Sequence, residues 1–248
     1  MAGRLFFLLP LYLVLLLCAE AVAHAAPAAP SATPAPRPQW NLPSLEYFIE
    51  KLPAPPRTGS FRDRLDLQDA RARQESMSQK QLAHAQVTFR LTVFTFAEAL
   101  GNDFTAEKFP KTAAFFSRVA SDANLIITGL KNHYQRVRPF QAHPGQVSIY
   151  VPAEAGYSYP SGHSTRSRLY AMLLTELDPS KKREISLCAQ KVATDRILAG
   201  EHYLTDLEAG RKLGKLIYQS LMRDPGFRAS LEAVRQAEWT QPAAKQPR

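Results

Sequence analysis

Apolar and polar positions along most of the chain follow the spacing of helices, and alternation of the strand type is scarce. Only VSIYV (147–151) offers a short strand that could pair briefly. Helices are predicted over residues 63–100, 109–121, 123–138, 164–177, 181–198 and 205–222. The pattern therefore predicts an all-α fold in the form of a single-domain helical bundle.

Proline, glycine and asparagine separate the predicted helices. The stretch LPAPPRTGS (52–60) is typical of a loop, and residues 101–103 (GND) of a turn. Pro139 is expected to end the helix before it, because a proline drives the preceding residue out of the helical region. Residues 141–160 combine prolines, glycines and aromatics, and a loop of this length in a compact domain is usually functional.

The first 25 residues have the layout of a secretory signal peptide. Arg4 supplies a positive charge, an apolar run follows, and small residues near position 25 offer a cleavage site. The run is too short to span a bilayer comfortably. Cys18 supports a lipoprotein signal as a second interpretation, although a leucine precedes it where such signals have a small residue.

The remaining chain divides into a tether, a domain and a tail. Residues 26–43 are rich in proline and alanine, which predicts an extended tether. Residues 44–240 are expected to form the helical domain, and residues 241–248 a disordered tail. No later segment is apolar over the length of a membrane span. We therefore expect a periplasmic or secreted protein with no stable membrane insertion after signal cleavage.

Composition limits how this domain is stabilised and what it binds. After cleavage Cys188 is the one cysteine left, so a packed core rather than an internal disulfide must stabilise the fold. The full chain has 31 basic and 22 acidic residues; losing Arg4 and Glu20 leaves 30 and 21, still +9. This charge favours phosphates, nucleic acid or a membrane surface as partners, without choosing among them.

The first candidate cluster is KNHYQRVRP (131–139). If the helix continues to Arg138, Lys131 and Arg138 share one face, roughly 10 Å apart along the axis. Two cations on one polar face could hold a single anion, with the planar fork of the arginine matching phosphate oxygens. A solvated basic face is the alternative interpretation.

The second cluster is PSGH, in which Pro160, Ser161 and Gly162 lead into a helix that begins at His163. The free N–H groups at a helix N-terminus form a natural anion site. Glycine permits close approach of the backbone, and the serine can add a hydroxyl donor. His163 would then stand beside the anion, able to give it a proton. An ordinary helix cap with a surface histidine is the alternative.

The third cluster is DRILAGEHYLTD (195–206). Arg196 closes one helix, and Asp206 follows His202 by one helical turn. An aspartate that accepts from one imidazole nitrogen leaves the other as a nucleophile or base. A metal site is a second interpretation of this pair, weakened by the cations expected nearby. The third is a structural histidine that only forms a hydrogen bond with a neighbouring carboxylate.

The order of the three clusters resembles the three-part signature of the type 2 phosphatidic acid phosphatase superfamily, which also includes vanadium haloperoxidases. The exported context, the LPAPPRTGS stretch and the runs RVRPF (136–140) and GYSYPSGH (156–163) are similar to bacterial class A non-specific acid phosphatases. The resemblance covers roughly residues 45–218. Asp195 departs from it, because the family often has serine there, and this puts one supporting contact in doubt.

The resemblance implies a helical bundle of the acid phosphatase/vanadium-dependent haloperoxidase type and a metal-independent acid phosphatase. The implied catalytic residues are His163, His202 and Asp206, and the implied phosphate-binding residues are Lys131, Arg138, Ser161, Gly162 and Arg196. His202 would attack phosphorus to form a phosphohistidine, while His163 would protonate the leaving alcohol and then activate water. No metal or other cofactor is expected, and activity should fall at both pH extremes around an acidic optimum.

The expected partners are small-molecule phosphomonoesters, with no nucleic acid, and a homodimer follows from the resemblance alone. A vanadate-dependent haloperoxidase, with His202 as the vanadate ligand, is the nearest alternative, but the short chain favours the phosphatase. A membrane lipid phosphatase would need several spanning helices. A non-catalytic periplasmic phosphate-binding protein would need the cations but gain nothing from both His163 and the His202–Asp206 pair.

Overall fold

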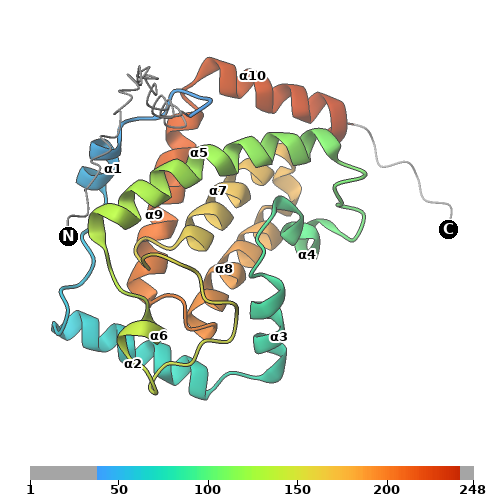
Figure 1. The fold of residues 1–248 in the computed structure, drawn as a ribbon. Helices are drawn as coiled ribbons and strands as arrows, with labels where there is room; N and C mark the ends of the chain where they lie inside the picture. Colours follow the sequence, from blue (N-terminus) through green and yellow to red (C-terminus); the bar gives the residue numbers. More distant parts are fainter. Residues whose placement is uncertain (1–37, 241–248) are drawn as a thin grey trace, which may run out of the picture. The chain divides into compact units, whose positions relative to one another are not determined.

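The computed structural model describes residues 38–240, which form helices joined by loops, with no strand among them (Figure 1). This confirms the predicted all-α fold, and residues 147–151 do not form the short strand that the sequence offered. The elements are α1 (Leu45–Lys51), α2 (Phe61–Glu75), α3 (Gln79–Val87), η1 (Val93–Phe96), α4 (Ala97–Leu100), α5 (Pro110–Tyr134), α6 (Pro139–Ala142), α7 (Gly162–Leu177), η2 (Pro179–Lys181), α8 (Lys182–Leu198), α9 (Leu204–Leu221), α10 (Pro225–Val234) and the π-helical turn η3 (Arg235–Trp239).

Helix α7 is the central element, packed against α5, α8 and α9 (Figure 1). Its side chains Leu169, Leu173 and Leu174 are fully buried in the main core. Burying one leucine contributes about 1.5–3 kcal/mol, so this helix anchors the fold. The N-terminus of α7 carries the PSGH sequence, and the core therefore fixes the position of that stretch.

Two glycines allow α9 to lie directly against α7. A Cβ on Gly210 would come within 2.7 Å of the carbonyl oxygen of Ser161, and one on Gly214 within 2.5 Å of that of Thr165. Both distances are shorter than real Cβ contacts allow, so larger residues would push the helices apart. This close approach brings the start of α9, with Asp206, next to the start of α7: the Ser161 N–H donates to the Asp206 carbonyl at 3.0 Å.

The single helix predicted over residues 63–100 is wrong, because this segment is divided into α2, α3, η1 and α4. At the start of α3, the Ser78 hydroxyl accepts from the Gln81 N–H (3.3 Å) while the Gln81 side chain accepts from the Ser78 N–H (2.9 Å). Thr92 and Thr95 form the corresponding box before η1. Ser78 and Thr92 do not interrupt the helical pattern of the sequence, but in the structure they act as helix N-caps. The resulting break lets α3 pack against α8.

The helices predicted over 109–121 and 123–138 form one helix, α5, which stops at Tyr134. Gln135 takes a left-handed conformation with φ of 50° and ends the helix. Arg138 is extended, as expected for a residue before proline. The prediction that Lys131 and Arg138 share a helical face is therefore wrong, and Pro139 begins α6 instead of ending α5.

The predicted tether is wrong for its last residues, 38–43. Trp40 is 7% exposed and packs edge-on to Phe227, with ring centroids 5.0 Å apart. The Asp122 carboxylate accepts from the backbone N–H groups of Gln39 and Trp40, which fixes this segment to α5. The predicted signal peptide, the tether up to residue 37 and the tail 241–248 lie outside the described residues.

Helix α10 and η3 were not predicted, and they complete the core around α5. Trp239 packs against Phe104 and Phe109 with centroid distances of 5.6 and 5.4 Å. The Glu238 carboxylate accepts from the N–H groups of Lys111 and Thr112 at 2.7 and 2.8 Å. It thereby satisfies donors at the N-terminus of α5, which has no side-chain cap of its own.

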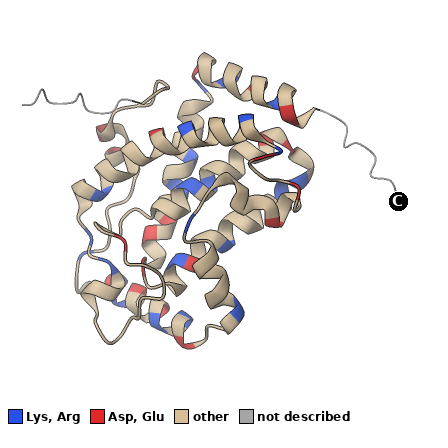
Figure 2. Cartoon of the chain, turned by 45° about the vertical axis from the view of Figure 1, so that its right-hand side comes forward, with Lys and Arg blue, Asp and Glu red and all other residues tan. Residues whose placement is uncertain are grey.

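Within residues 38–240, no helix combines the length and hydropathy needed to cross a membrane. Lys and Arg occur on many of the helices and are interspersed with Asp and Glu (Figure 2). The charge excess therefore does not mark one binding face, and the site has to be located from individual contacts.

Candidate active site

Direct contacts join the three sequence clusters. The N–H groups of Glu201 and His202 donate to the Arg196 carbonyl at 3.0 and 3.2 Å, so the end of α8 leads straight to His202. The Arg138 guanidinium is hydrogen-bonded to the Glu201 carboxylate, and the first turn of α7 is bonded to α9 through Ser161 and Asp206. Elements far apart in the sequence thus meet at one buried place.

His202 and Asp206 are buried and adjacent. The two are 1% and 0% exposed, and Nδ1 of His202 lies 3.4 Å from Oδ2 of Asp206. The same oxygen accepts from the Tyr203 N–H at 2.9 Å, which fixes the carboxylate at the start of α9. With Nδ1 directed at the carboxylate, Nε2 of His202 keeps the lone pair that a nucleophile needs.

His163 lies in the first turn of α7 and is 3% exposed. Its Nε2 is 2.9 Å from the carbonyl oxygen of Phe89. Because a carbonyl oxygen only accepts, Nε2 carries a hydrogen, and Nδ1 is left as the atom that can gain or release a proton. The surface histidine considered from the sequence is therefore not what the structure contains.

Both histidines favour the neutral form in this setting. Burial lowers the pKa of His163 well below its ordinary value, and the charges of Arg196 and Arg166 lower it further. Burial also lowers the pKa of His202, with added effects of Lys131, Arg138 and Arg196. The charge of His202 in turn acts on His163, so the two imidazoles lie within electrostatic range of each other.

Arg196 is 1% exposed, and most of its donors have no acceptor. Its Nη2 donates to the carbonyl of Ala85 and, at 3.3 Å, to the hydroxyl of Thr88. Nε and Nη1 are buried and have no hydrogen-bond partner among residues 38–240. Asp195, Glu154 and Glu201 act on its charge, but none of these carboxylates forms an ion pair with it among residues 38–240. Because buried donors are normally paired, the two nitrogens indicate where an anion would bind.

Arg138 is equally buried but already has counter-charges. Its Nη1 donates to the carboxylate of Glu201, Nη2 to that of Glu154 at 3.1 Å, and Nε to the carbonyl of Gly156 at 3.2 Å. The expectation of a free guanidinium fork is therefore wrong at this position. Most of its donors are occupied, and one Nη2 hydrogen stays available.

Lys131 adds a further cation beside these groups. Its ammonium donates to the carbonyl oxygens of Tyr157 and, at 3.5 Å, Ser158. Burial lowers its pKa to about 8, and the neighbouring Arg138 charge acts in the same direction. The amine is therefore close to losing its charge just above neutral pH.

The N-terminus of α7 offers fewer free donors than the sequence suggested. The N–H of Ser161 is bonded to the carbonyl of Asp206, so it is not available to a ligand, and the Ser161 hydroxyl accepts from the Ser164 N–H at 3.3 Å. Among residues 38–240, no acceptor is bonded to the N–H groups of Gly162 and His163. The helix terminus can therefore supply these two backbone donors together with the hydroxyl hydrogen of Ser161.

Arg136 is the main residue that sequence reasoning missed. Its Nη1 donates to Oδ1 of Asp206 at 2.7 Å and its Nη2 to Asp66 at 2.8 Å, while its guanidinium stacks on Tyr203 at 4.0 Å. Burial opposes its charge, but the carboxylates of Asp206 and Asp66 raise its pKa above the ordinary range. The RVRPF run contained the signal, a second arginine two residues before Arg138. Because this segment is extended, Arg136 and Arg138 do not lie on one helical face.

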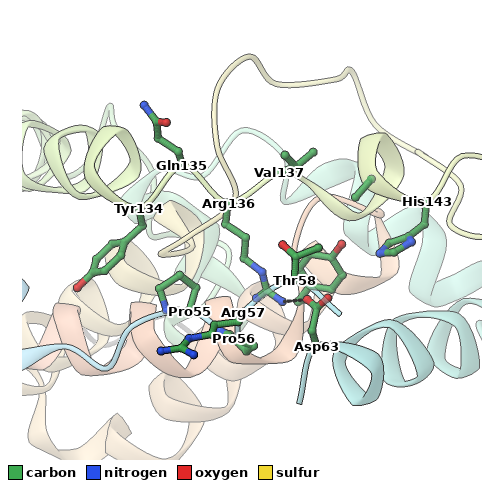
Figure 3. Close-up of a pocket in the computed structure, with 12 residues that line it drawn as sticks. Pro55, Pro56, Arg57, Thr58, Asp63, Tyr134, Gln135, Arg136, Val137 and His143 are labelled. Carbon is green, nitrogen blue, oxygen red and sulfur yellow. Dashed lines mark hydrogen bonds and ion pairs between the residues drawn. The ribbon is translucent and has the colours of Figure 1, made fainter. Parts of the chain in front are cut away.

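A cavity of about 430 Å³ lies on the other side of this arginine, lined by residues 55–58, Asp63, His143 and Tyr203 among others (Figure 3). In Figure 3 the Arg136 side chain runs down toward Asp63, to which it is bonded at 3.1 Å. None of the eight predicted site residues lines this cavity. It is therefore separate from the cluster around the two histidines.

Metal ligands are not grouped in the part of the chain that the structure describes. No set of three or more His, Cys, Asp or Glu residues there could hold a metal ion. His202 and Asp206 are surrounded by Arg136, Arg138 and Lys131, whose positive charges oppose a divalent cation.

Comparisons with known proteins place the chain among its relatives. The family model described as the PAP2 superfamily matches residues 112–228, which include all eight predicted site residues. The non-specific acid phosphatase of Salmonella typhimurium is 27% identical over 147 residues (57% of this chain, 58% of that protein). That of Salmonella typhi is 32% identical over 111 residues (43% and 44%). The acid phosphatase of Zymomonas mobilis is 29% identical over 143 residues (56% and 54%).

A solved structure, the transmembrane PAP2-type phosphatidylglycerolphosphate phosphatase from Bacillus subtilis, has a TM-score of 0.49 and 21% identity, covering 69% of this chain and 88% of that one. The chain spans about half the length of the curated relatives that it matches. The resemblance expected from the sequence is confirmed: residues 112–228 match the PAP2 superfamily model, and the chain is a distant homologue of bacterial non-specific acid phosphatases.

Proposed function

We propose that the protein is an exported, metal-independent acid phosphatase that hydrolyses small phosphomonoesters through a phosphohistidine. The observation that carries the proposal is Arg196, a buried cation with two unpaired nitrogens near two buried histidines and a free helix N-terminus. A tetrahedral dianion supplies the acceptors that these donors lack. The relatives named acid phosphatases support the same reaction.

In this proposal the cations and the α7 terminus hold the phosphoryl group. Arg196 donates through Nε and Nη1, and Lys131 and Arg138 act mainly through their charge. Gly162 contributes its N–H and Ser161 its hydroxyl. Donors fixed before the reaction stabilise charge on the phosphoryl oxygens during transfer without having to reorganise.

His202 is the nucleophile in this scheme and His163 the proton carrier. Nε2 of His202 attacks phosphorus, the P–N bond forms, and the bond to the leaving oxygen breaks as Nδ1 of His163 gives that oxygen a proton. In the second step water attacks phosphorus, its proton passes to His163, the P–N bond breaks and phosphate leaves. Asp206, itself held by Arg136, keeps Nδ1 of His202 as the donor throughout.

The proposal predicts an acidic optimum. His163 has to be protonated at the start, but its pKa in the free protein lies well below the ordinary value, so few molecules carry that proton at neutral pH. Acid supplies it, and a bound dianion stabilises it further.

Export is part of the proposal and is supported by the charged, apolar and small-residue regions of residues 1–25.

Hydrolysis of p-nitrophenyl phosphate by the purified protein tests the proposal. We expect turnover at pH 5 that persists with excess EDTA and is lost with micromolar vanadate. His202→Ala should abolish turnover, whereas the matched change His133→Ala, at an exposed histidine of α5, should leave it intact. Loss of activity with EDTA, or full activity of His202→Ala, would contradict the proposal. Bromide oxidation with vanadate and peroxide would instead indicate the haloperoxidase.

A further inference from the structure

The C-terminal end of α3 and the residues just after it hold two of the proposed site residues, although nothing in the sequence pointed to this segment. The carbonyl of Ala85, in the last turn of α3, accepts from Nη2 of Arg196, and the carbonyl of Phe89, two residues beyond the helix, accepts from Nε2 of His163. Carbonyls at a helix C-terminus have no partner inside the helix, and the helix dipole favours positive charge there. The end of α3 is therefore suited to hold a guanidinium, and the segment after it holds the imidazole.

Asp195 and Thr88 orient Arg196 on this platform. Asp195 is 3% exposed, and its Oδ2 lies 2.6 Å from the Thr88 hydroxyl oxygen. Because the carboxylate only accepts, the hydroxyl gives its hydrogen to Asp195 and presents its lone pairs to Nη2 of Arg196 at 3.3 Å. This contact uses Nη2 of the guanidinium, and Nε and Nη1 stay without a partner among residues 38–240.

His84 holds Asp195 from the other side and ties three helices together. Its Nδ1 is 2.7 Å from Oδ2 of Asp195 on α8, and its Nε2 is 3.2 Å from Oε2 of Glu98 on α4. Both ring nitrogens face carboxylates, so both contacts are hydrogen bonds only when the imidazole is doubly protonated. A neutral His84 has a single N–H and keeps one of the two.

We propose that Asp195, Thr88 and His84 are positioning residues that set the anion affinity of Arg196. The inference rests on the proposed function for its biological meaning, but its effect is on anion binding. His84 joins α3 to α8 through Asp195 and to α4 through Glu98, and Asp195 holds the Thr88 hydroxyl in place under Arg196. Loss of any of these contacts loosens the support of the guanidinium.

The groups around His84 show how it links the helices. Asp195 faces it from α8 and Glu98 from α4, and Lys191 of α8 pairs with Glu98. Arg196 lies beyond the Thr88 hydroxyl. His84 thus contacts Arg196 only through Asp195 and Thr88.

Isothermal titration of vanadate into the whole protein tests the inference without requiring turnover. Thr88→Val removes the hydroxyl at nearly constant volume, and Thr88→Ser keeps it. We expect the valine variant to bind vanadate about tenfold more weakly at pH 5 and the serine variant to stay within about twofold of the natural protein. Equal affinities for the two variants would overturn the role of the hydroxyl. If Thr88→Val does not fold, Asp195→Asn carries the same tenfold expectation.

A substitution of His84 tests its part in the same titration. His84→Gln should bind vanadate several-fold more weakly than the natural protein at pH 5, because an amide cannot reproduce both contacts of the imidazole. The control His133→Gln, at an exposed histidine of α5, should bind vanadate like the natural protein. Equal affinities of His84→Gln and His133→Gln would overturn the positioning role of His84.

The outcomes separate this inference from the proposed function. Normal hydrolysis with vanadate affinities that ignore Thr88 and His84 would reject the inference alone. Vanadate binding that follows the predicted variants, without any hydrolysis of p-nitrophenyl phosphate, would reject the phosphatase and keep the positioning role. A natural protein that binds no vanadate would overturn both.

Discussion

Arg138 and Arg196 are equally buried but differ in their direct partners. Arg138 sits between the carboxylates of Glu201 and Glu154, so the protein balances its charge. Arg196 rests on a carbonyl and a hydroxyl, and two of its nitrogens have no acceptor within residues 38–240. Among buried donors in the same range, Arg166 and Arg235 each leave Nε alone unpaired. The comparison teaches that burial does not identify a ligand-binding cation by itself, and that the number of unpaired donors adds the missing information.

Replacing Arg138 should have the largest effect, and it should be on stability. In Arg138→Met the Glu201 carboxylate is left buried without its partner, which should lower the free energy of unfolding by about 3–5 kcal/mol. Urea unfolding followed by circular dichroism measures this. Adding Glu201→Gln should recover part of the loss, and an unchanged midpoint in the single variant would show that the pair is not the stabilising unit described here.

Replacing Arg196 should instead act on catalysis. Arg196→Met removes donors that the folded protein leaves unpaired, so stability should change little or rise, while kcat/KM for p-nitrophenyl phosphate should fall about 10²–10³-fold. Steady-state kinetics and urea unfolding on the same sample give both values. A variant that is strongly destabilised yet active would reverse the comparison between the two arginines.

The two histidines should make the free energy of unfolding depend on pH, which sharpens the comparison. Both histidines have lowered pKa values in the folded protein, so as the pH falls the unfolded chain binds protons before the folded protein does. The stability present above pH 6.5 is therefore lost as the pH falls toward the pKa values of the folded protein. The slope should be about 1.4 kcal/mol per pH unit for each histidine. Urea unfolding between pH 4.5 and 7.5 measures it.

The two arginine variants separate the histidines. Arg196 lowers the pKa of both His163 and His202, whereas Arg138 is a cause of the shift at His202. An NMR titration of the imidazoles should therefore show the His163 pKa rising in Arg196→Met and staying nearly fixed in Arg138→Met. Equal rises at His163 in the two variants would contradict the arrangement.

Lys131 should set a smaller effect at alkaline pH. Loss of the His163 proton already lowers kcat/KM as the pH rises toward neutral. The pKa of Lys131, about 8, means that the free protein also loses this charge as the pH rises through that value, so kcat/KM should fall more steeply there. Lys131→Arg keeps its charge and should remove the added steepness. The same steep fall near pH 8 in Lys131→Arg would assign it to another group.

The sequence predicted the elements whose pattern is local and missed the contacts that depend on tertiary structure. PSGH was correctly expected at the start of a helix, and His202 was expected beside Asp206, because both are short-range features. The helix end at Gln135 was missed, since a left-handed glutamine has no distinctive local pattern.

The counter-charges were also missed, for a related reason. Glu201 and Glu154 are ordinary acidic residues in the sequence, and their pairing with Arg138 follows from how the 141–160 loop returns to the start of α9. Arg136 was noticed as part of the RVRPF run, but its bonds to Asp66 and Asp206 join α2 and α9, which no local pattern connects.

The most direct test of the account is a rapid acid-free quench of the protein during turnover of ³²P-labelled phosphomonoester in the presence of EDTA. The account predicts a labelled protein whose phosphate is stable in alkali and released in acid, with the label on the peptide that contains His202. Label on a serine or aspartate, or a labelled intermediate that disappears when metal is removed, would contradict it.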